Sequence, residues 1–191
     1  MYRVTEVRKI IAQEMMSLDG FFAGPGGELD WFVWDDDLKN YTIRLFDTID
    51  TLLFGRVTYE YMAGYWPTTK EEDPAITEGM NNLPKFVFSR SLDKTDWNNS
   101  VLVKDIVPQE IEKMKRRPGR DMAIFGSGSI VSKFASLGLI DEYRIIVNPV
   151  VLGNGKPLFN GFKDRLLLEL RETMTFGSGT VLLVYAPAGP Q

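Results

Sequence analysis

Two glycine-containing turns are the segments of this sequence whose residue types best suit chemistry. In the later one, an apolar run ends at Gly126, and Ser127, Gly128, Ser129 and Ile130 follow at the start of a predicted helix. Glycine lets the backbone approach a bound group closely, and the first turn of a helix offers unpaired N–H donors and a positive partial charge. Phosphate is the natural ligand of such a turn, and a tight turn that binds nothing is the equally weighted alternative.

The earlier turn has a similar arrangement. The apolar run of residues 51–54 ends at Gly55, and Arg56 and Thr58 stand at the head of the next predicted helix. An arginine at this place can form two parallel hydrogen bonds to a phosphate, and the threonine hydroxyl can support it. Alone, this pattern is more typical of a surface arginine and a helix cap. Two such turns in one chain favour a ligand that carries several phosphates.

A third apolar run is followed by Ser89 and Arg90. Small hydroxyls and a cation at the carboxyl edge of a strand lie where α/β proteins bind ligands, although an ordinary turn is the commoner interpretation. The G-x-G-x-x-G spacing of dinucleotide-binding turns is incomplete in the later glycine turn, because Val131 stands where the third glycine would be.

The loop after the first apolar run could cover a ligand. Asp19 and Gly20 predict a tight turn, and Phe21 and Phe22 follow in a glycine-rich stretch. Such a loop can close over a flat ring. The alternative is a hairpin turn that places both phenylalanines in the core.

Acidic residues provide the candidates for proton chemistry. Asp35, Asp36 and Asp37 begin a predicted helix directly after a segment that holds Trp31 and Trp34. Carboxylates in a first turn interact favourably with the helix dipole, so capping explains at least two of the three. The sharper hypothesis is that one of them faces a pocket walled by a tryptophan and holds a nitrogen heterocycle.

Glu14 is an acid of a different kind, because it lies within the first predicted strand. Side chains alternate along a strand, so Glu14 points to the opposite face from Gln13. If that face is buried, the carboxylate needs a partner.

The composition excludes several classes of protein. The 191 residues include no Cys and no His, which excludes disulfides, Ser-His-Asp and Cys-His catalysis, and zinc sites built on thiolate or imidazole. We expect no metal. A net charge of -4 argues against a broad nucleic-acid surface. The apolar runs are far shorter than the roughly 20 residues of a membrane helix, so we expect no membrane association and a cytoplasmic location.

Strand-like and helix-like segments alternate along the chain and must position these residues. Several strand-like runs lack strict alternation, as in strands buried on both faces. The predicted strands are residues 9–16, 51–54, 85–89, 101–103, 121–125, 143–148, 166–176 and 180–186. The predicted helices are residues 35–48, 56–63, 107–117 and 127–137, and residues 68–74 predict a surface loop. The order favours a single α/β domain over residues 1–191, with a mostly parallel central sheet and antiparallel strands at its C-terminal end.

The ordered set of motifs resembles the dihydrofolate reductase-like superfamily. It is most similar to the C-terminal reductase domain of the bifunctional riboflavin-biosynthesis deaminase-reductase and its stand-alone relatives. The matching segments are residues 17–20 (SLDG), 54–60 (FGRVTYE), 88–90 (FSR), 125–130 (FGSGSI), 139–144 (LIDEYR) and 149–159 (PVVLGNGKPLF). The resemblance implies a three-layer α/β/α fold, NADPH as the cofactor, and hydride transfer to a small heterocycle.

The resemblance also implies roles for individual residues in binding the cofactor. Gly55, Arg56 and Thr58 would hold the pyrophosphate and the adenosine 2′-phosphate, and Ser89 and Arg90 would border the adenine ribose. The other implied contacts are Asp19, Gly20 and Phe22 at the nicotinamide, and Gly126, Ser127, Gly128, Ser129 and Ile130 at the pyrophosphate. The two arginines favour NADPH over NADH, because guanidinium groups bind a 2′-phosphate well.

On the substrate side, the resemblance points to an acid and to aromatic walls. In folate reductases a carboxylate on the first helix pairs with the pterin, and the best corresponding position is Asp37, with Asp36 one step away. Gln13 stands where riboflavin-type reductases carry a lysine. The expected substrate-binding residues are Gln13, Trp31, Trp34 and Trp66, with Phe22 as a further wall.

The leading expectation is a stand-alone NADPH-dependent reductase of a 5-amino-6-(5-phosphoribosylamino)uracil-type pyrimidine of riboflavin biosynthesis. Three alternatives stay open, namely a pterin or dihydrofolate reductase, a non-catalytic dinucleotide-binding protein that kept the fold, and a protein whose glycine turns bind a phosphate unrelated to NADPH. The substitution at Gln13 motivates the non-catalytic alternative. Relatives are often dimers, so we expect a homodimer built on the apolar C-terminal strands.

Overall fold

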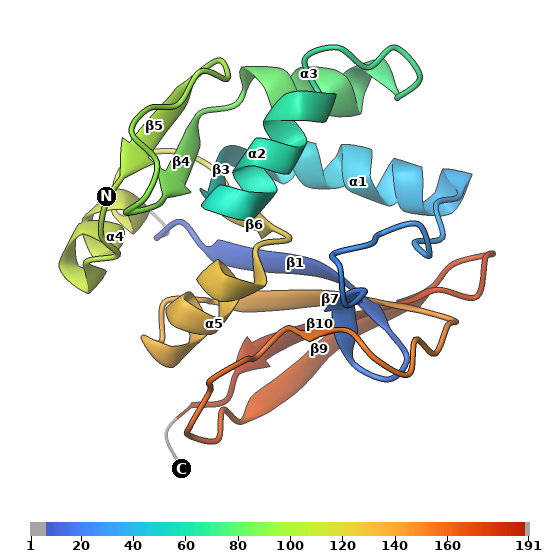
Figure 1. Ribbon diagram of the computed structural model, residues 1–191. Coiled ribbons are helices and arrows are strands. Elements are labelled where there is room, and N and C mark those ends of the chain that lie inside the picture. The colour runs from blue at the N-terminus through green and yellow to red at the C-terminus, as the bar shows by residue number, and fades with distance from the viewer. Residues whose placement is uncertain (1–6, 190–191) are drawn as a thin grey trace, which may run out of the picture.

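The computed structural model describes residues 7–189 and has an eight-stranded sheet with helices on both faces (Figure 1). The elements in chain order are β1 Ile10–Ser17, β2 Phe21–Ala23, α1 Asp36–Thr48, β3 Ile49–Gly55, α2 Arg56–Tyr65, α3 Pro74–Asn82, β4 Lys85–Phe88, β5 Ser100–Val103, α4 Pro108–Lys115, β6 Asp121–Phe125, α5 Gly128–Ser136, β7 Glu142–Asn148, β8 Lys156–Pro157, β9 Leu168–Thr175 and β10 Val181–Pro187. Residues 1–6 and 190–191, which the single-domain prediction includes, lie outside the described part of the chain.

The large sheet is parallel over most of its width. Its strand order is β5-β4-β3-β6-β1-β7-β10-β9. Every pair from β5 to β7 is parallel, whereas β10 pairs antiparallel with both β7 and β9. A separate small sheet pairs β2 with β8. The predicted parallel sheet with antiparallel C-terminal strands is therefore confirmed.

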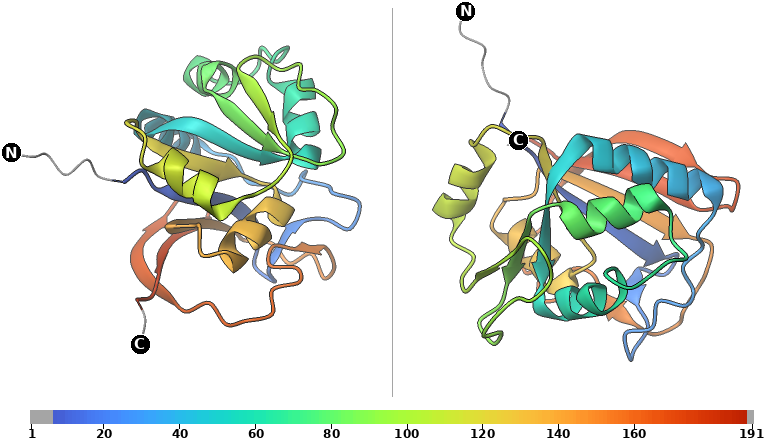
Figure 2. Two further views of the ribbon diagram at one scale, coloured as in Figure 1. Left: turned by 90° about the vertical axis from the view of Figure 1, so that its left-hand side faces the viewer. Right: turned by 90° about the horizontal axis from the view of Figure 1, so that it is seen from above.

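Alternating side chains of the central strand β1 contribute to two different cores. Ile10 and Ala12 pack with Phe134 of α5 on one face, and Ile11 packs with Leu45 of α1 on the other. The helices α4 and α5 cover the first face, and α1, α2 and α3 cover the second (Figure 2). This is the three-layer α/β/α architecture that the resemblance implied.

The helix α3 is the main element that the sequence analysis missed. Its first residue, Pro74, follows Asp73, whose carboxylate accepts a hydrogen bond from an N–H of the first turn at 2.9 Å. Only Ile76 and Met80 of this helix are buried, so its apolar pattern is too short to stand out from a loop. The two short strands β2 and β8 were also not predicted, because pairing between distant loops defines them.

Residues 7–189 lack two further features. No helix in this part of the chain combines the length and the apolar character that crossing a bilayer requires. The same residues hold no cluster of acidic side chains arranged to bind a metal ion.

Candidate functional site

The two glycine turns meet at one edge of the sheet. β3 and β6 are parallel neighbours, so α2 and α5, which follow them directly, begin at the same edge. The Gly55 N–H donates a hydrogen bond to the Ser127 hydroxyl at 2.9 Å and links the two turns. We call residues 55–58 and 126–130 the paired turns.

Close packing explains why glycine occupies both turns. A Cβ atom at Gly55 would lie 2.8 Å from Cγ1 of Ile130, and one at Gly126 would lie 3.3 Å from Cγ2 of Thr58. Gly126 and Ser127 both have left-handed backbones, with φ of 61° and 64°. This conformation costs a serine roughly 1 kcal/mol, which the hydrogen bond that its hydroxyl accepts from the Gly55 N–H helps to offset.

The helices that begin at the paired turns have uncapped N-terminal ends. Within residues 7–189, an aspartate side chain caps the first turn of α1 and of α3, but no side chain caps α2 or α5. The first turns of α2 and α5 also contain no acidic residue. Their N–H donors and positive partial charge are therefore available to an anion.

Arg56 and Arg90 take part in surface ion pairs close to this edge. Arg56 donates to Glu60 at 2.9 Å, and Arg90, which follows the end of β4, donates to Asp105 at 2.7 Å. The four side chains are between 46% and 84% exposed. Exposed pairs of this kind contribute only about 0–1 kcal/mol, so a phosphate can replace either carboxylate at little cost.

Ser89 has a local structural role. Its side chain is buried, and its hydroxyl accepts hydrogen bonds from the N–H groups of Ser91 at 3.2 Å and Leu92 at 3.1 Å. These bonds hold the turn that presents Arg90. The position of Ser89 beside the adenine ribose, which the resemblance implied, stays a prediction.

The loop after β1 is fastened to the connection between β7 and β8. The Asp19 carboxylate accepts hydrogen bonds from the N–H groups of Leu152 at 3.1 Å and Gly153 at 2.7 Å. Hydrogen bonds from the Ser17 hydroxyl and from these amides hold the pKa of Asp19 below its ordinary value. Gly20 turns the chain with a left-handed φ of 90°. Asp19 therefore anchors this loop, and its implied contact with nicotinamide stays a prediction.

Phe22 brings the same loop against the paired turns. A Cβ atom at Gly128 would lie 2.7 Å from the phenyl ring. Both residues line a cavity of about 590 Å³ beside α5, whose lining also includes Phe162, Lys133 and Lys156. Neither lysine forms an ion pair within residues 7–189, so this cavity is positively charged.

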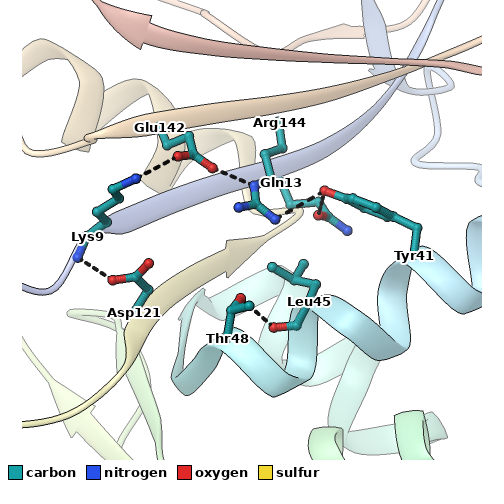
Figure 3. A network of polar contacts seen from close by, with 8 residues as sticks. All are labelled: Lys9, Gln13, Tyr41, Leu45, Thr48, Asp121, Glu142 and Arg144. Carbon is teal, nitrogen blue, oxygen red and sulfur yellow. Dashed lines mark hydrogen bonds and ion pairs between the residues drawn. The ribbon is translucent and has the colours of Figure 1, made fainter. Parts of the chain in front are cut away.

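A series of polar contacts connects the sheet with α1 (Figure 3). The Tyr41 hydroxyl donates to Oε1 of Gln13 at 3.2 Å and accepts a hydrogen bond from Arg144 at 3.4 Å. Arg144 pairs with Glu142 at 2.6 Å, and Glu142 pairs with Lys9 at 3.1 Å. Burial raises the pKa of Tyr41, so its phenol stays neutral and can both donate and accept.

Gln13 is the one residue of this network that was predicted as a site residue, whereas Tyr41 and Arg144 were not predicted. Arg144 gave a usable signal, because it is the one charged residue in the predicted strand of residues 143–148. A charged side chain within an otherwise apolar strand needs a partner when the sheet is covered by helices. Tyr41 gave no comparable signal, since tyrosine is ordinary on the inner side of a helix.

The three aspartates at the start of α1 have separate partners. Asp35 caps the helix by accepting a hydrogen bond from an N–H of its first turn at 2.8 Å. Asp36 is 87% exposed and pairs with Lys39 at 2.6 Å, and Asp37 accepts a hydrogen bond from the Gly177 N–H at 3.2 Å. None of the three is buried. The proton-transfer role suggested for Asp37 or Asp36 therefore stays a prediction.

The tryptophans expected around a substrate are spread over different places. Trp34 is exposed and lines a second cavity, of about 650 Å³, together with Asp35, Asp36, Lys39 and residues 71–73. The Trp31 indole donates to a backbone carbonyl at 3.1 Å in the loop before α1. Trp66 ends α2 and packs into the core on the α3 side of the sheet. The structure thus brings Trp34, and not Trp66, to this cavity.

Glu14 is the acid in this region that lacks a partner. It is 2% exposed, and it alternates with Ala12 and Met16 on the face of β1 that α5 covers. The register between β1 and β6 ends with the pair Gln13 and Phe125, and Glu14 and Gly126 are the next residues after that pair. Its Oε1 atom has no hydrogen-bond partner within residues 7–189, and burial raises its pKa well above the ordinary value. A carboxyl group that favours its neutral form therefore lies at the level of the paired turns.

Comparisons with known proteins agree with this fold. The family model of the RibD C-terminal domain matches residues 8–182. An uncharacterised protein of Bacillus subtilis, YyaP, is 40% identical over 182 residues, which cover 93% of this chain and 94% of YyaP. A candidate riboflavin biosynthesis protein from Shewanella sp. PV-4 has a TM-score of 0.77 at 22% identity, covering 95% of this chain and 99% of that chain. A dihydrofolate reductase from Enterococcus faecalis, complexed with NADP(H), has a TM-score of 0.64 at 15% identity, covering 95% of this chain and 97% of that chain.

The two solved structures have low sequence identity to this chain, so they show a shared fold alone. The family match is of another kind, because it extends from β1 to β10 and includes both glycine turns. The chain therefore belongs to the RibD C-terminal domain family.

Proposed function

We propose that this chain is an NADPH-dependent reductase that transfers a hydride to a small heterocycle. The observation that carries the proposal is the meeting of two uncapped helix ends at the paired turns. A dinucleotide contains two adjacent phosphates, which need donors from more than one direction and little steric bulk around them. The paired turns offer the N–H groups of two helices, with glycine at the points of closest approach.

The residues around the paired turns fit the parts of such a cofactor. Gly55, Thr58 and residues 126–130 would hold the pyrophosphate, and Arg56 and Arg90 would bind the 2′-phosphate in place of their surface carboxylates. NADPH supplies the hydride when it is bound. The protein then has to orient the two reacting rings and exclude water from them.

The proposed substrate is a 5-amino-6-(5-phosphoribosylamino)uracil-type pyrimidine of riboflavin biosynthesis. Family membership supports this choice, and so does the charge of the cavity beside α5. Lys133 and Lys156 give that cavity a positive potential, which favours a phosphorylated substrate. The cavity at Trp34 is lined by five carboxylates and one lysine, so it would repel the same phosphate.

We expect this reductase to act in the cytoplasm as a homodimer. β9 forms one edge of the large sheet and is mostly exposed. Leu170 on this strand and Leu167, just before it, are each 53% exposed. An uncovered edge strand with apolar side chains is a template for pairing with a second copy. Sedimentation equilibrium of the purified protein tests this part of the proposal, and a monomeric mass would exclude it.

The cofactor is tested by titrating the protein with NADPH and, separately, with NADH, while the quenching of tryptophan fluorescence is followed. We expect NADPH to bind at least about tenfold more tightly, because each arginine contact to the 2′-phosphate contributes roughly 1.5–3 kcal/mol. Arg56→Ala should remove most of that preference. Arg171→Ala is the matched control, since Arg171 also forms an exposed ion pair, on β9. Failure to bind either dinucleotide would refute the proposal.

The reaction is tested by following NADPH oxidation with the ribosylaminouracil substrate and with dihydrofolate. Turnover of the ribosylaminouracil without turnover of dihydrofolate supports the pyrimidine assignment. The reverse result identifies a folate-type reductase. Tight NADPH binding without turnover of either compound would favour the non-catalytic alternative.

A further inference from the structure

Glu14 is a buried acid that the fold does not use. It lies on β1, a central strand flanked by β6 and β7, where the other side chains facing α5 are apolar. A leucine would suit that pattern and would avoid the cost of removing a carboxyl group from water. Oε1 of Glu14 makes no hydrogen bond that would stabilise the fold within residues 7–189, so a bound ligand would explain the acid.

The elements packed against this face do not supply a partner for the free oxygen. β7 places Ile145 opposite Glu14, and α5 contributes Ile130 and Phe134 to the same core. Within residues 7–189, Oε1 of Glu14 therefore has apolar neighbours and no hydrogen bond. A buried polar atom without a partner typically costs about 1–3 kcal/mol, which a bound ligand could recover.

Burial is the cause of the raised pKa of Glu14, and the ionisable groups of the surrounding elements do not reverse this direction. Tyr143 of β7 is buried, and burial raises its pKa, so it stays neutral. Lys133 of α5 and Lys156 of β8 are exposed at the cavity beside Phe22. The neutral form of Glu14, which burial favours, offers one O–H donor and a carbonyl acceptor on the same planar group.

The strand order indicates which end of a dinucleotide would reach Glu14. Arg90 follows β4, which lies on one side of β3, whereas β1 lies beyond β6 on the other side. A cofactor whose 2′-phosphate is near Arg56 and Arg90, and whose pyrophosphate is on the paired turns, extends its remaining end towards β1. That end is the nicotinamide, whose primary carboxamide has a donor and an acceptor side by side. A neutral carboxyl group is the complementary partner for it.

We infer that Glu14 is a cofactor-binding residue whose carboxyl group forms a pair of hydrogen bonds with the carboxamide of the nicotinamide ring. The inference rests on the proposed function, because it assigns a residue to one part of the proposed cofactor. Two parallel bonds would fix the rotation of the carboxamide and orient the ring that carries the hydride. The proton on Glu14 is needed for binding, and the carboxyl group takes no part in the transfer itself.

The test compares two variants with two probes by isothermal titration calorimetry. Glu14→Leu keeps the approximate volume and removes both polar atoms, whereas Glu14→Gln keeps a donor and an acceptor. The probes are NADPH and 2′-phospho-ADP-ribose, which has the same phosphates and no nicotinamide. Thermal unfolding of each variant verifies that it is folded before it is titrated.

We expect Glu14→Leu to weaken NADPH binding about tenfold to a hundredfold, which corresponds to the loss of one or two hydrogen bonds in a buried site. The same variant should bind 2′-phospho-ADP-ribose within about threefold of the wild type. Glu14→Gln should bind both probes within about threefold, because the amide can pair with the carboxamide in the same way.

Several outcomes would overturn the inference, and they differ from failure of the proposed function. NADPH binding that is unchanged in Glu14→Leu excludes a contact with the ring. Equal weakening of both probes means that Glu14 acts by shaping the paired turns. If Glu14→Gln binds NADPH as weakly as Glu14→Leu does, then hydrogen bonding does not explain the contribution of Glu14. Wild-type protein that binds neither probe refutes the proposed function first, and the inference falls with it.

Discussion

Lys85 and Glu14 are both buried ionisable side chains on the same sheet, and the fold treats them in opposite ways. Lys85, the first residue of β4, is 0% exposed, and its ammonium donates to the carbonyls of Asn81 at 3.0 Å, Leu83 at 2.8 Å and Asn98 at 3.1 Å. Glu14 is 2% exposed, and one of its oxygens has no partner within residues 7–189. Backbone carbonyls satisfy the ammonium group of Lys85, whereas one carboxyl oxygen of Glu14 remains available to a ligand.

The partners of Lys85 explain its presence through the fold alone. Two of its three carbonyls belong to the last residues of α3 and the loop that follows, which have lost their intrahelical partners. The ammonium also lies 4.4 Å from the centre of the Trp97 ring. It therefore ties the end of α3 to the start of β4 and to the loop before β5. Burial of a charged residue therefore indicates a ligand only when the surrounding backbone does not satisfy its polar atoms.

Replacing Lys85 should produce the largest effect. Lys85→Met keeps much of the volume and leaves three carbonyls without their donor, so we expect a loss of about 3 kcal/mol in the free energy of unfolding. Chemical denaturation monitored by circular dichroism measures it. Lys94→Met is the control, because Lys94 is exposed and only pairs with Asp96 at 3.0 Å. A loss below about 1 kcal/mol for Lys85→Met would show that the three contacts do not anchor α3.

Replacing Glu14 should have a smaller effect of opposite sign. Glu14→Leu removes an unsatisfied buried carboxyl group, so the free energy of unfolding at neutral pH should rise by roughly 1–2 kcal/mol. The same denaturation experiment measures this without any cofactor. If the variant is less stable than the wild type, then Glu14 has a structural partner, and its contrast with Lys85 disappears.

The sequence predicted those parts of the molecule that depend on neighbouring residues. The paired turns are visible as two strand ends that meet glycine and then a helix, and the structure joins them through Gly55 and Ser127. The opposite orientations of Gln13 and Glu14 also follow from strand alternation. Whether the face that carries Glu14 is buried is a property of the packed sheet, and the strand pattern alone leaves it open.

The missed features depend on residues far apart in the chain. Tyr41 and Arg144 contact each other across 103 positions, and Asp19 binds the backbone of Leu152 and Gly153 across 133 and 134 positions. No local pattern encodes such pairs. The motif around Asp19 suggested a ligand contact, and the structure shows that its carboxylate also binds the connection between β7 and β8.

The smallest expected effects are changes of stability with pH, and they should have opposite signs for Glu14 and Lys85. Burial raises the pKa of Glu14 above 4.5, so the folded state keeps a proton that the unfolded chain releases. Wild-type stability should therefore fall, relative to Glu14→Gln, as pH rises from 4.5 towards the raised pKa. Burial lowers the pKa of Lys85 from 10.5 to about 8, so the unfolded chain holds the extra proton in that interval. Wild-type stability should rise there relative to Lys85→Met.

Each of these slopes is at most about 1.4 kcal/mol per pH unit, so the measurement needs denaturation curves at closely spaced pH values. Taking the difference between each variant and the wild type removes the titration of the many other groups, including Tyr41, whose pKa burial also raises. If wild-type stability does not fall relative to Glu14→Gln above pH 4.5, then the pKa of Glu14 is not raised and the carboxyl group is ionised in the fold. An ionised carboxylate accepts hydrogen bonds and donates none, so it could not form the two-way pair with a carboxamide.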